Sequence, residues 1–411
     1  MTTLLIFIFF IALLLIGVPI FVIISGLALY LLFSSQIDIS ALIIEMHRMA
    51  TTPALVAIPL FTFAGYLLSA SGAPQRLIRL SNAFLGWLPG GLSVIALLTC
   101  AVFTTLTGAT GLTIIALGGI LLPAMMRGRY PEKFSLGLLF PPSLPLIIYA
   151  IVAKVRIDHL FIAGLLPGLL LVLLLSAFCV YKSVRTDVPK TRFQFKELSG
   201  AARQILWELP LPFVVLGGIY SGYFAVSEAA ALTAVYVLLA EVVIYRDVRI
   251  RQLPEIMKKS MILVGGILII LGAAMGLTNY LVDAEIPMRL LDFLKANIES
   301  RVAFLVVLNI FLLAVGCTMG IFSALVVVVP LLAPIAEAYG IDPIHLGIIF
   351  LANLEIGASI PPLGINLFIA SMRFEKPILR LYLASLPFIA ILLLALAIIT
   401  YVPWMSLALI K

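Results

Sequence analysis

The chain has 411 residues, of which 63% are hydrophobic and only 11% are charged, and its mean hydropathy is +1.24. A soluble protein has about 45–50% apolar and about 25% charged residues, so this composition excludes a water-soluble globular enzyme. The formal net charge of +7 does not indicate nucleic-acid binding, because the basic residues lie in short stretches between apolar segments. The sequence therefore predicts an all-α polytopic protein of the lipid bilayer, with no nucleic-acid partner.

The apolar segments are long enough to cross a membrane, which takes about 20 helical residues. The first, residues 3–33, lacks the basic start and cleavage site of a signal peptide, so we expect it to be a transmembrane helix. The others lie at 41–70, 92–126, 134–153, 157–181, 205–245, 260–282, 302–336, 344–372 and 378–409. Several are too long for one helix and contain breaks, which predicts interrupted helices.

Two breaks lie in the first half of the chain, at residues 104–113 (TTLTGATGLT) and 140–143 (FPPS). Proline removes a helical donor and frees a carbonyl, and glycine lets the backbone turn or approach another segment closely. In hydrocarbon, such breaks survive only where they line protein or a wet cavity. Close helix packing by Gly and Thr is the alternative for any single break.

Two basic stretches divide the rest of the chain. The linker 182–204 is rich in Lys and Arg, and residues 246–259 hold a second basic patch. The positive-inside bias places both in the cytoplasm, so the segment between them crosses the membrane twice, with its turn at residues 220–223 (YSGY). We divide the chain into a first transmembrane repeat, a cytoplasmic linker and a second transmembrane repeat, at residues 1–181, 182–204 and 205–411.

The two repeats share four landmarks in the same order: an apolar residue followed by Pro, a single Pro, a Pro-Pro pair, and an apolar motif that ends in Pro. In the first half they are 122–123, 131, 141–142 and 161–167, and in the second half 333–334, 343, 361–362 and 382–387. Two homologous halves of this kind are a common plan of membrane transporters.

The second half also has two breaks, at residues 316–320 (GCTMG) and 357–366 (GASIPPLGIN). Freed carbonyls, hydroxyls and the Asn366 amide would form an oxygen-rich cage suited to Na⁺, and half-helix N-termini would favour an anion. Because the breaks recur in both halves, we favour two ion sites flanking one substrate site at mid-membrane.

The candidate site residues follow from the breaks. The first Na⁺ site is assigned to Thr105, Gly108, Thr110 and Ser143, and the second to Cys317, Thr318, Ser359, Gly364 and Asn366. Thr107 and Arg373 are candidate substrate contacts, with a cytoplasmic or interfacial anchor as the favoured alternative for Arg373.

Two acids lie within apolar segments, Glu228 and Glu355. A buried carboxylate costs about 2.5–3.5 kcal/mol on insertion scales, so each needs a partner or a purpose. Glu228 is equally well explained as a helix N-terminal cap, completed by Ser227. For Glu355, a structural hydrogen bond near the second Pro-Pro pair is favoured over proton carriage.

In combination, the motifs at 59–65 (PLFTFAG), 220–222 (YSG), 227–231 (SEAAA) and 361–368 (PPLGINLF) resemble the DctM-type large membrane subunit of tripartite ATP-independent periplasmic (TRAP) transporters. The resemblance implies a Na⁺-driven importer of C4-dicarboxylates, sialic acid or similar organic anions in the bacterial inner membrane. It implies two partners, a small four-helix membrane subunit and a soluble periplasmic binding protein. The implied fold has two inverted repeats, each with a reentrant hairpin and a broken helix, and moves as an elevator.

The sequence departs from that family in three places. The interval from Pro343 to Pro361 is 18 residues, but that from Pro131 to Pro141 is only 10. The eight missing residues correspond to about 12 Å of helix, a loss that should disable the first ion site. Either this protein is defective there or the natural protein has a stretch that this sequence lacks, and we favour the second interpretation. Gly320 stands where the family often has an acid, and Ile360 stands where it usually has a Thr before the Pro-Pro pair.

The sequence has three alternative interpretations. A self-contained Na⁺/dicarboxylate symporter or an arsenite-type permease is the rival from the same superfamily, and a passive channel is another possibility. An integral membrane enzyme is disfavoured, since the sequence holds no HExxH motif, Ser/His/Asp arrangement or carboxylate cluster.

Overall fold

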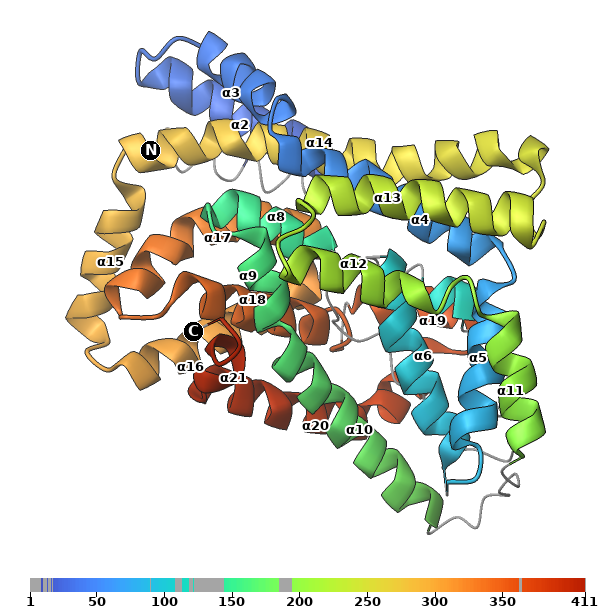
Figure 1. Cartoon of the computed structure of the whole chain (residues 1–411). Coiled ribbons are helices and arrows are strands. Elements are labelled where there is room, and N and C mark those ends of the chain that lie inside the picture. Colours follow the sequence, from blue (N-terminus) through green and yellow to red (C-terminus); the bar gives the residue numbers. More distant parts are fainter. Residues whose placement is uncertain are drawn as a thin grey trace.

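The computed structural model describes residues 9, 13, 16, 18–88, 90–107, 113–117, 121, 144–184, 194–361 and 364–410, and these are helical with connecting turns and contain no strand (Figure 1). The helices before the basic linker are α2 (Ile20–Ser34), α3 (Ser40–Ala50), η1 (Pro53–Val56), α4 (Ala57–Ala70), α5 (Ala73–Leu85), α6 (Gly91–Thr107), α8 (Leu144–Ala153), α9 (Ile157–Ala163) and α10 (Leu165–Val184).

The helices after the linker are α11 (Phe195–Gln204), α12 (Pro210–Tyr220), α13 (Val226–Leu238), the π-helical η2 (Leu239–Ile244), η3 (Ile250–Gln252), α14 (Leu253–Asp283), α15 (Ile286–Asn297), α16 (Arg301–Thr318), α17 (Ile321–Ala338), α18 (Pro343–Gly357), α19 (Ile365–Phe374), α20 (Ile378–Tyr401) and α21 (Trp404–Leu407). The turn predicted at 220–223 lies between α12 and α13, where Gly222 adopts a positive φ of 75° that glycine tolerates without a Cβ clash.

Six helical stretches among the described residues are long and apolar enough to cross a membrane: Ile157–Val184, Val226–Ile244, Ile250–Asp283, Arg301–Thr318, Ile321–Ala338 and Ile378–Tyr401. Two further apolar helices are shorter, because α18 has 15 residues and α19 has 10. At 1.5 Å per residue they extend about 22 Å and about 15 Å, so neither crosses the hydrocarbon core alone. Together they have the form of one transmembrane helix that is broken near its middle.

The long helix α14 lies along one side of the molecule, with α2, α3 and α4 against it and α13 against α4 (Figure 1). On the other side, α18 contacts α16, α17 and α20, and α8 contacts α17. One large cluster of buried apolar residues runs through both groups. Many large apolar side chains remain on the outside, including Phe213 and Ile262, which suits a lipid-facing surface.

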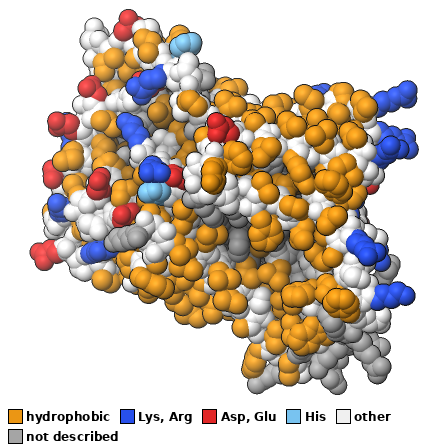
Figure 2. Space-filling model, in the orientation of Figure 1, with side chains coloured by type: hydrophobic (Ala, Val, Ile, Leu, Met, Phe, Trp, Pro, Cys, Tyr) orange, Lys and Arg blue, Asp and Glu red, His pale blue; other side chains and the backbone are white. Residues whose placement is uncertain are grey.

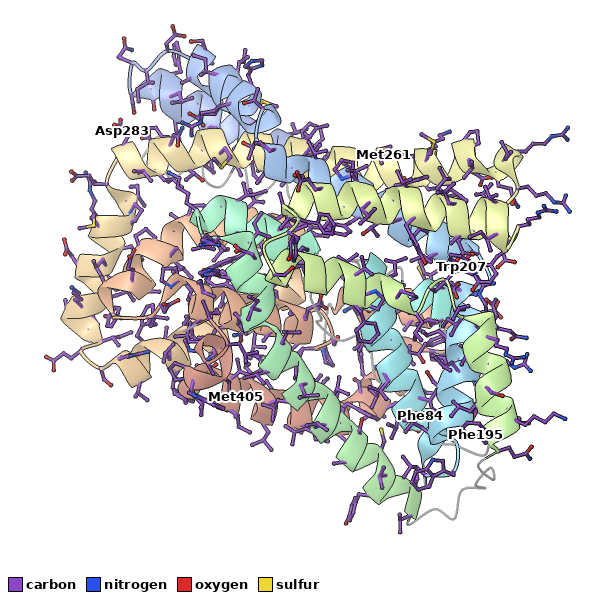
Figure 3. All side chains as sticks on the ribbon, viewed as in Figure 1. Phe84, Phe195, Trp207, Met261, Asp283 and Met405 are labelled. Atoms are coloured by element: carbon purple, nitrogen blue, oxygen red, sulfur yellow. The ribbon has the colours of Figure 1, made fainter. Side chains whose placement is uncertain are left out.

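Charge distinguishes the two ends of the molecule. Figure 2 shows mostly Lys and Arg at the right edge, whereas the left side has acidic side chains with Lys and Arg among them. Along α14, Asp283 lies at the left end and Met261 lies to the right of it (Figure 3). The exposed aromatic residues Phe84, Phe195 and Trp207 also lie toward the right, as expected at a membrane interface. By the positive-inside rule the right end is the cytoplasmic end.

Candidate functional site

The breaks predicted in the second half coincide with real helix ends. Helix α16 ends at Thr318 and α17 begins at Ile321, while α18 ends at Gly357 and α19 begins at Ile365. We call these four helix ends and their connections the second-half junction.

Two glycines bring α16 and α18 into backbone contact at this junction. A Cβ on Gly316 would lie 2.9 Å from Leu354 Cα, and a Cβ on Gly357 would lie 2.8 Å from Leu313 O and 2.9 Å from Gly316 Cα. Real Cβ atoms do not approach other atoms so closely, so only glycine fits at both positions. The close-packing alternative therefore holds for these two residues, and the packing also sets the ends of the two helices side by side.

The connection between α18 and α19 folds back on itself through its own backbone. The amide of Asn366 donates to the carbonyl of Ala358 at 3.0 Å, and the amide of Gly364 donates to that of Ile360 at 3.0 Å. The thiol of Cys317, from α16, also donates to the Ile360 carbonyl, with Sγ and O 3.3 Å apart. Two of the carbonyls that the sequence predicted to be freed by the break thus have donors, and Cys317 ties the two breaks together.

The hydroxyls of the junction keep their lone pairs. Thr318 Oγ1 donates to the carbonyls of Ala314 and Val315, at 3.0 and 3.1 Å, and Ser359 Oγ donates to that of Glu355 at 3.3 Å. A hydroxyl that donates its one proton still offers two lone pairs to a cation. Ser359 and the Asn366 side chain are buried, at 3% and 4% exposure, whereas Thr318 is exposed.

Helix dipoles add opposite charges to the junction. The C-terminal ends of α16 and α18 carry partial negative charge, which favours a cation, and the N-terminal ends of α17 and α19 favour an anion. The N-cap residues of α17 and α19 are Gly320 and Gly364, which offer no capping side chain. The junction can therefore accommodate both a cation and a carboxylate.

The first predicted ion site falls largely outside the described residues. Gly108, Thr110 and Ser143 lie outside them, and Thr105 and Thr107 belong to α6 without described side chains. Beside this break, the hydroxyls of Thr104 and Thr113 are 2.9 Å apart and both residues are buried, which holds the two sides of residues 105–112 together. These two threonines were in the predicted motif but not among the candidate ligands.

Arg373 connects the two halves. It lies in the last turn of α19, and its Nε donates to the carbonyl of Ile115, just after the first break, at 3.0 Å. This contact joins the end of α19 to the first half. Both interpretations of Arg373, as a substrate contact and as a cytoplasmic or interfacial anchor, stay predictions.

Glu228, one of the two acids within the apolar segments, caps α13. Its carboxylate accepts a hydrogen bond from the amide of Ala225 at 2.9 Å. The cap interpretation is therefore the one with geometric support, although the carboxylate and not Ser227 makes the bond.

The sequence reasoning missed a buried ionic cluster around Arg76 of α5. Arg76 Nη2 lies 2.5 Å from Glu208 Oε1 and 2.9 Å from Glu241 Oε2, and Nη1 lies 2.5 Å from Asp247 Oδ2. Its guanidinium also lies over the Tyr245 ring, 3.9 Å from the centroid. Glu241 is fully buried. The criterion that selected Glu228, an acid in an apolar run, would also have selected Glu241.

Arg76 remains charged in this cluster. Burial alone would lower its pKa, but the hydrogen bonds that its guanidinium donates to Glu208 and Asp247 outweigh burial and raise the pKa of Arg76 above its ordinary value. The amide of Gly72, just before α5, also donates to Asp247 Oδ2 at 2.9 Å. The cluster therefore fastens the start of α5 to η2 and to the segment before α12.

The geometry defines an all-α membrane protein with a broken-helix junction of the kind that transporters use for ions and solutes. Residues 7–405 match the family described as "Tripartite ATP-independent periplasmic transporter, DctM component". The chain belongs to this family, and it is a multi-pass protein of the bacterial inner membrane.

Named relatives agree with this assignment. The chain is 37% identical to the C4-dicarboxylate TRAP transporter large permease protein DctM of Pseudomonas aeruginosa, over 94% of this chain and 92% of the relative. It is 34% identical to the protein of the same name from Vibrio cholerae, over 99% and 97%. It is 31% identical to the ectoine/5-hydroxyectoine TRAP transporter large permease protein UehC of Ruegeria pomeroyi, over 94% of each.

Among solved structures, the fold is similar to that of the YdaH transporter of Alcanivorax borkumensis, with a TM-score of 0.56 and 16% identity over 90% of this chain and 88% of that chain. The Vibrio cholerae alignment is longer than this chain. It spans 440 positions, whereas this chain has 411 residues, so the relative has at least 29 positions without a counterpart here.

Proposed function

We propose that this TRAP large permease couples the inward movement of a small organic anion, such as a C4-dicarboxylate, to the Na⁺ gradient. The observation that carries the proposal is the second-half junction, where the ends of α16 and α18 pack together and each is followed by a helix with an uncapped N-terminus. Ser359 and Asn366 are buried there. A carboxylate and a hard cation could bind there side by side, because each would meet the dipole ends that favour it.

The residue types fit Na⁺ at this junction. Ser359 and Asn366 supply oxygen donors from opposite ends of the α18–α19 connection, and Thr318 supplies a hydroxyl from the end of α16. The thiol of Cys317 is a soft donor that a hard cation disfavours, and it is bound to the Ile360 carbonyl. We therefore assign Cys317 a positioning role and keep the oxygen-bearing residues as ligands.

Two partners belong to the proposal. The word "tripartite" in the family description supports a complex of three components, for which we propose a small four-helix membrane subunit and a soluble periplasmic binding protein beside this chain. Relatives named for dicarboxylates and for ectoine indicate that homologous permeases serve different substrates, which suits a binding protein that selects the solute.

Uptake of labelled succinate into proteoliposomes tests the proposal. The vesicles would hold this chain with its small subunit, with and without the binding protein and an inward Na⁺ gradient. Uptake that requires both the binding protein and the Na⁺ gradient supports the proposal. Uptake with the Na⁺ gradient alone indicates a self-contained symporter. Uptake that follows the succinate gradient whatever the Na⁺ gradient indicates a channel and would overturn the coupling.

A further inference from the structure

A pocket of about 290 Å³ lies where α3, the α8–α9 connection and α14 meet. Most of its lining is apolar, including Ala150 and Met275, but two cationic residues, Arg48 and Lys154, and the hydroxyl residue Thr52 also line it. Its size suits a small organic molecule, and a few polar groups in an apolar lining are typical of ligand pockets.

The pocket faces the side opposite the basic linker. Lys154 lies three residues before the membrane-spanning stretch Ile157–Val184, whose far end leads into that linker. Met275 lies 22 residues after the start of α14 beside the second basic patch, which is about 33 Å along the helix. With the linker in the cytoplasm, the pocket opens toward the periplasm.

The local structure holds Lys154 at the end of α8. Its backbone is left-handed, with a φ of 55°, and the amide of Val155 donates back to the Ala150 carbonyl at 3.0 Å to close the helix. Glycine is the usual residue in this conformation, and a lysine there bears a backbone cost. Among the described residues, no acidic side chain pairs with Lys154, which is exposed.

Arg48 supplies the second charge from the opposite side. One of its terminal nitrogens, Nη2, pairs with Glu45 Oε2 at 2.8 Å, and its side chain is 62% exposed. The guanidinium has five N–H donors, so it can bind an anion while it keeps this pair. The two cations and one acid leave the pocket with a net positive charge.

The two cations also belong to different groups of helices. Arg48 lies on α3, which packs on α14, whereas Lys154 follows α8, which packs on α17 and α18 of the second-half junction. We propose that a small carboxylate-bearing anion binds between Arg48 and Lys154 on the periplasmic side before it reaches the junction. That this anion is the transported substrate rests on the proposed function.

The test uses Thr52→Cys as a reporter, because Thr52 lines the pocket and both cations stay in place. The native cysteines Cys100, Cys179 and Cys317 are buried. The protein is placed in phosphatidylcholine vesicles, and the measured quantity is the labelling ratio, the labelling rate with an anionic thiol reagent divided by that with a neutral one. Lys154→Gln or Arg48→Gln should lower this ratio at least roughly threefold. Succinate should slow the labelling, and Lys295→Gln, which removes an exposed charge from α15, should leave the rates unchanged.

Equal labelling ratios in the reporter with and without the two cations would overturn the proposal. The proposal would also be overturned if phosphatidylglycerol in the vesicles slowed the labelling but succinate did not. That result would assign the pocket to a lipid headgroup. The labelling needs no transport, so a protein that shows succinate protection but no Na⁺-dependent uptake would refute the proposed function and leave the pocket proposal standing. In active vesicles, Lys154→Gln should also raise the half-saturating concentration for uptake, while Lys295→Gln should not.

Discussion

Gly316 and Gly357 lie where the backbones of α16 and α18 are so close together that neither position has room for a Cβ, and this contact fixes how the two helices cross. It also explains why two helix C-termini come together in a membrane protein. Without side chains between them, the backbones approach, and the polar connections that follow both helices share one place.

Gly357→Ala should therefore separate α16 from α18. The added methyl group meets backbone atoms of Leu313 and Gly316 that cannot rotate away, so we expect a loss of about 1–3 kcal/mol in stability and a loss of Na⁺-dependent uptake. Thermal unfolding in detergent and uptake in vesicles measure the two effects. Gly266→Ala is the control, because a Cβ there meets nothing within 4 Å. Equal behaviour of the two variants would contradict the packing account.

Arg76→Gln should destabilise the protein more than any other single substitution of a charged residue in α5. It leaves the carboxylates of Glu208 and Glu241 buried without their cation, a loss that costs about 3–5 kcal/mol in buried ion pairs. Arg79→Gln is the matched control, because Arg79 bonds only to exposed Gln204 among the described contacts. Adding Glu241→Gln to Arg76→Gln should recover part of the unfolding temperature. No recovery would show that the charge of Glu241 is not the source of the loss.

The contact between Thr104 and Thr113 can be tested by cross-linking. Their hydroxyl oxygens are 2.9 Å apart, so cysteines at both positions should form a disulfide on oxidation. Thiol counting after denaturation should show two fewer free thiols than the reduced protein. The pair Thr113→Cys with Thr233→Cys, which places the second cysteine in α13, is the control. Failure of the first pair to oxidise would mean that the two sides of the first break lie apart.

The short interval before Pro141 gives a further prediction. An inserted half-helix of eight residues before Phe140 should raise Na⁺-dependent uptake above that of the sequence as it stands, since it would restore the spacing found before Pro361. An inserted stretch of eight Gly and Ser residues is the control for added length alone. If the two insertions gave equal uptake, or if neither raised uptake above that of the unaltered sequence, the half-helix would not be needed.

The sequence located the second-half breaks well because glycine and proline act locally on the backbone, as at Gly320 and Pro361. The turn before α13 was found for the same reason. The Arg76 cluster was not found, because it assembles residues from α5, η2 and two connections that are far apart in the sequence. Hydrogen-bond partners from distant segments were also beyond the sequence: the Cys317 thiol reaches the carbonyl of Ile360 only because α16 and α18 cross where they do.

Binding of radiolabelled Na⁺ to the purified protein tests the central claim most directly, with Asn366→Ala and Ser359→Ala as the variants. Both side chains are buried at the junction, and Asn297→Ala, an exposed amide on α15, is the control. Saturable Na⁺ binding that either junction variant weakens about tenfold or more, at unchanged expression, is the predicted result; such a change corresponds to about 1.4 kcal/mol. Na⁺ binding that is absent from the unaltered protein, or that survives both junction variants unchanged, would contradict the account.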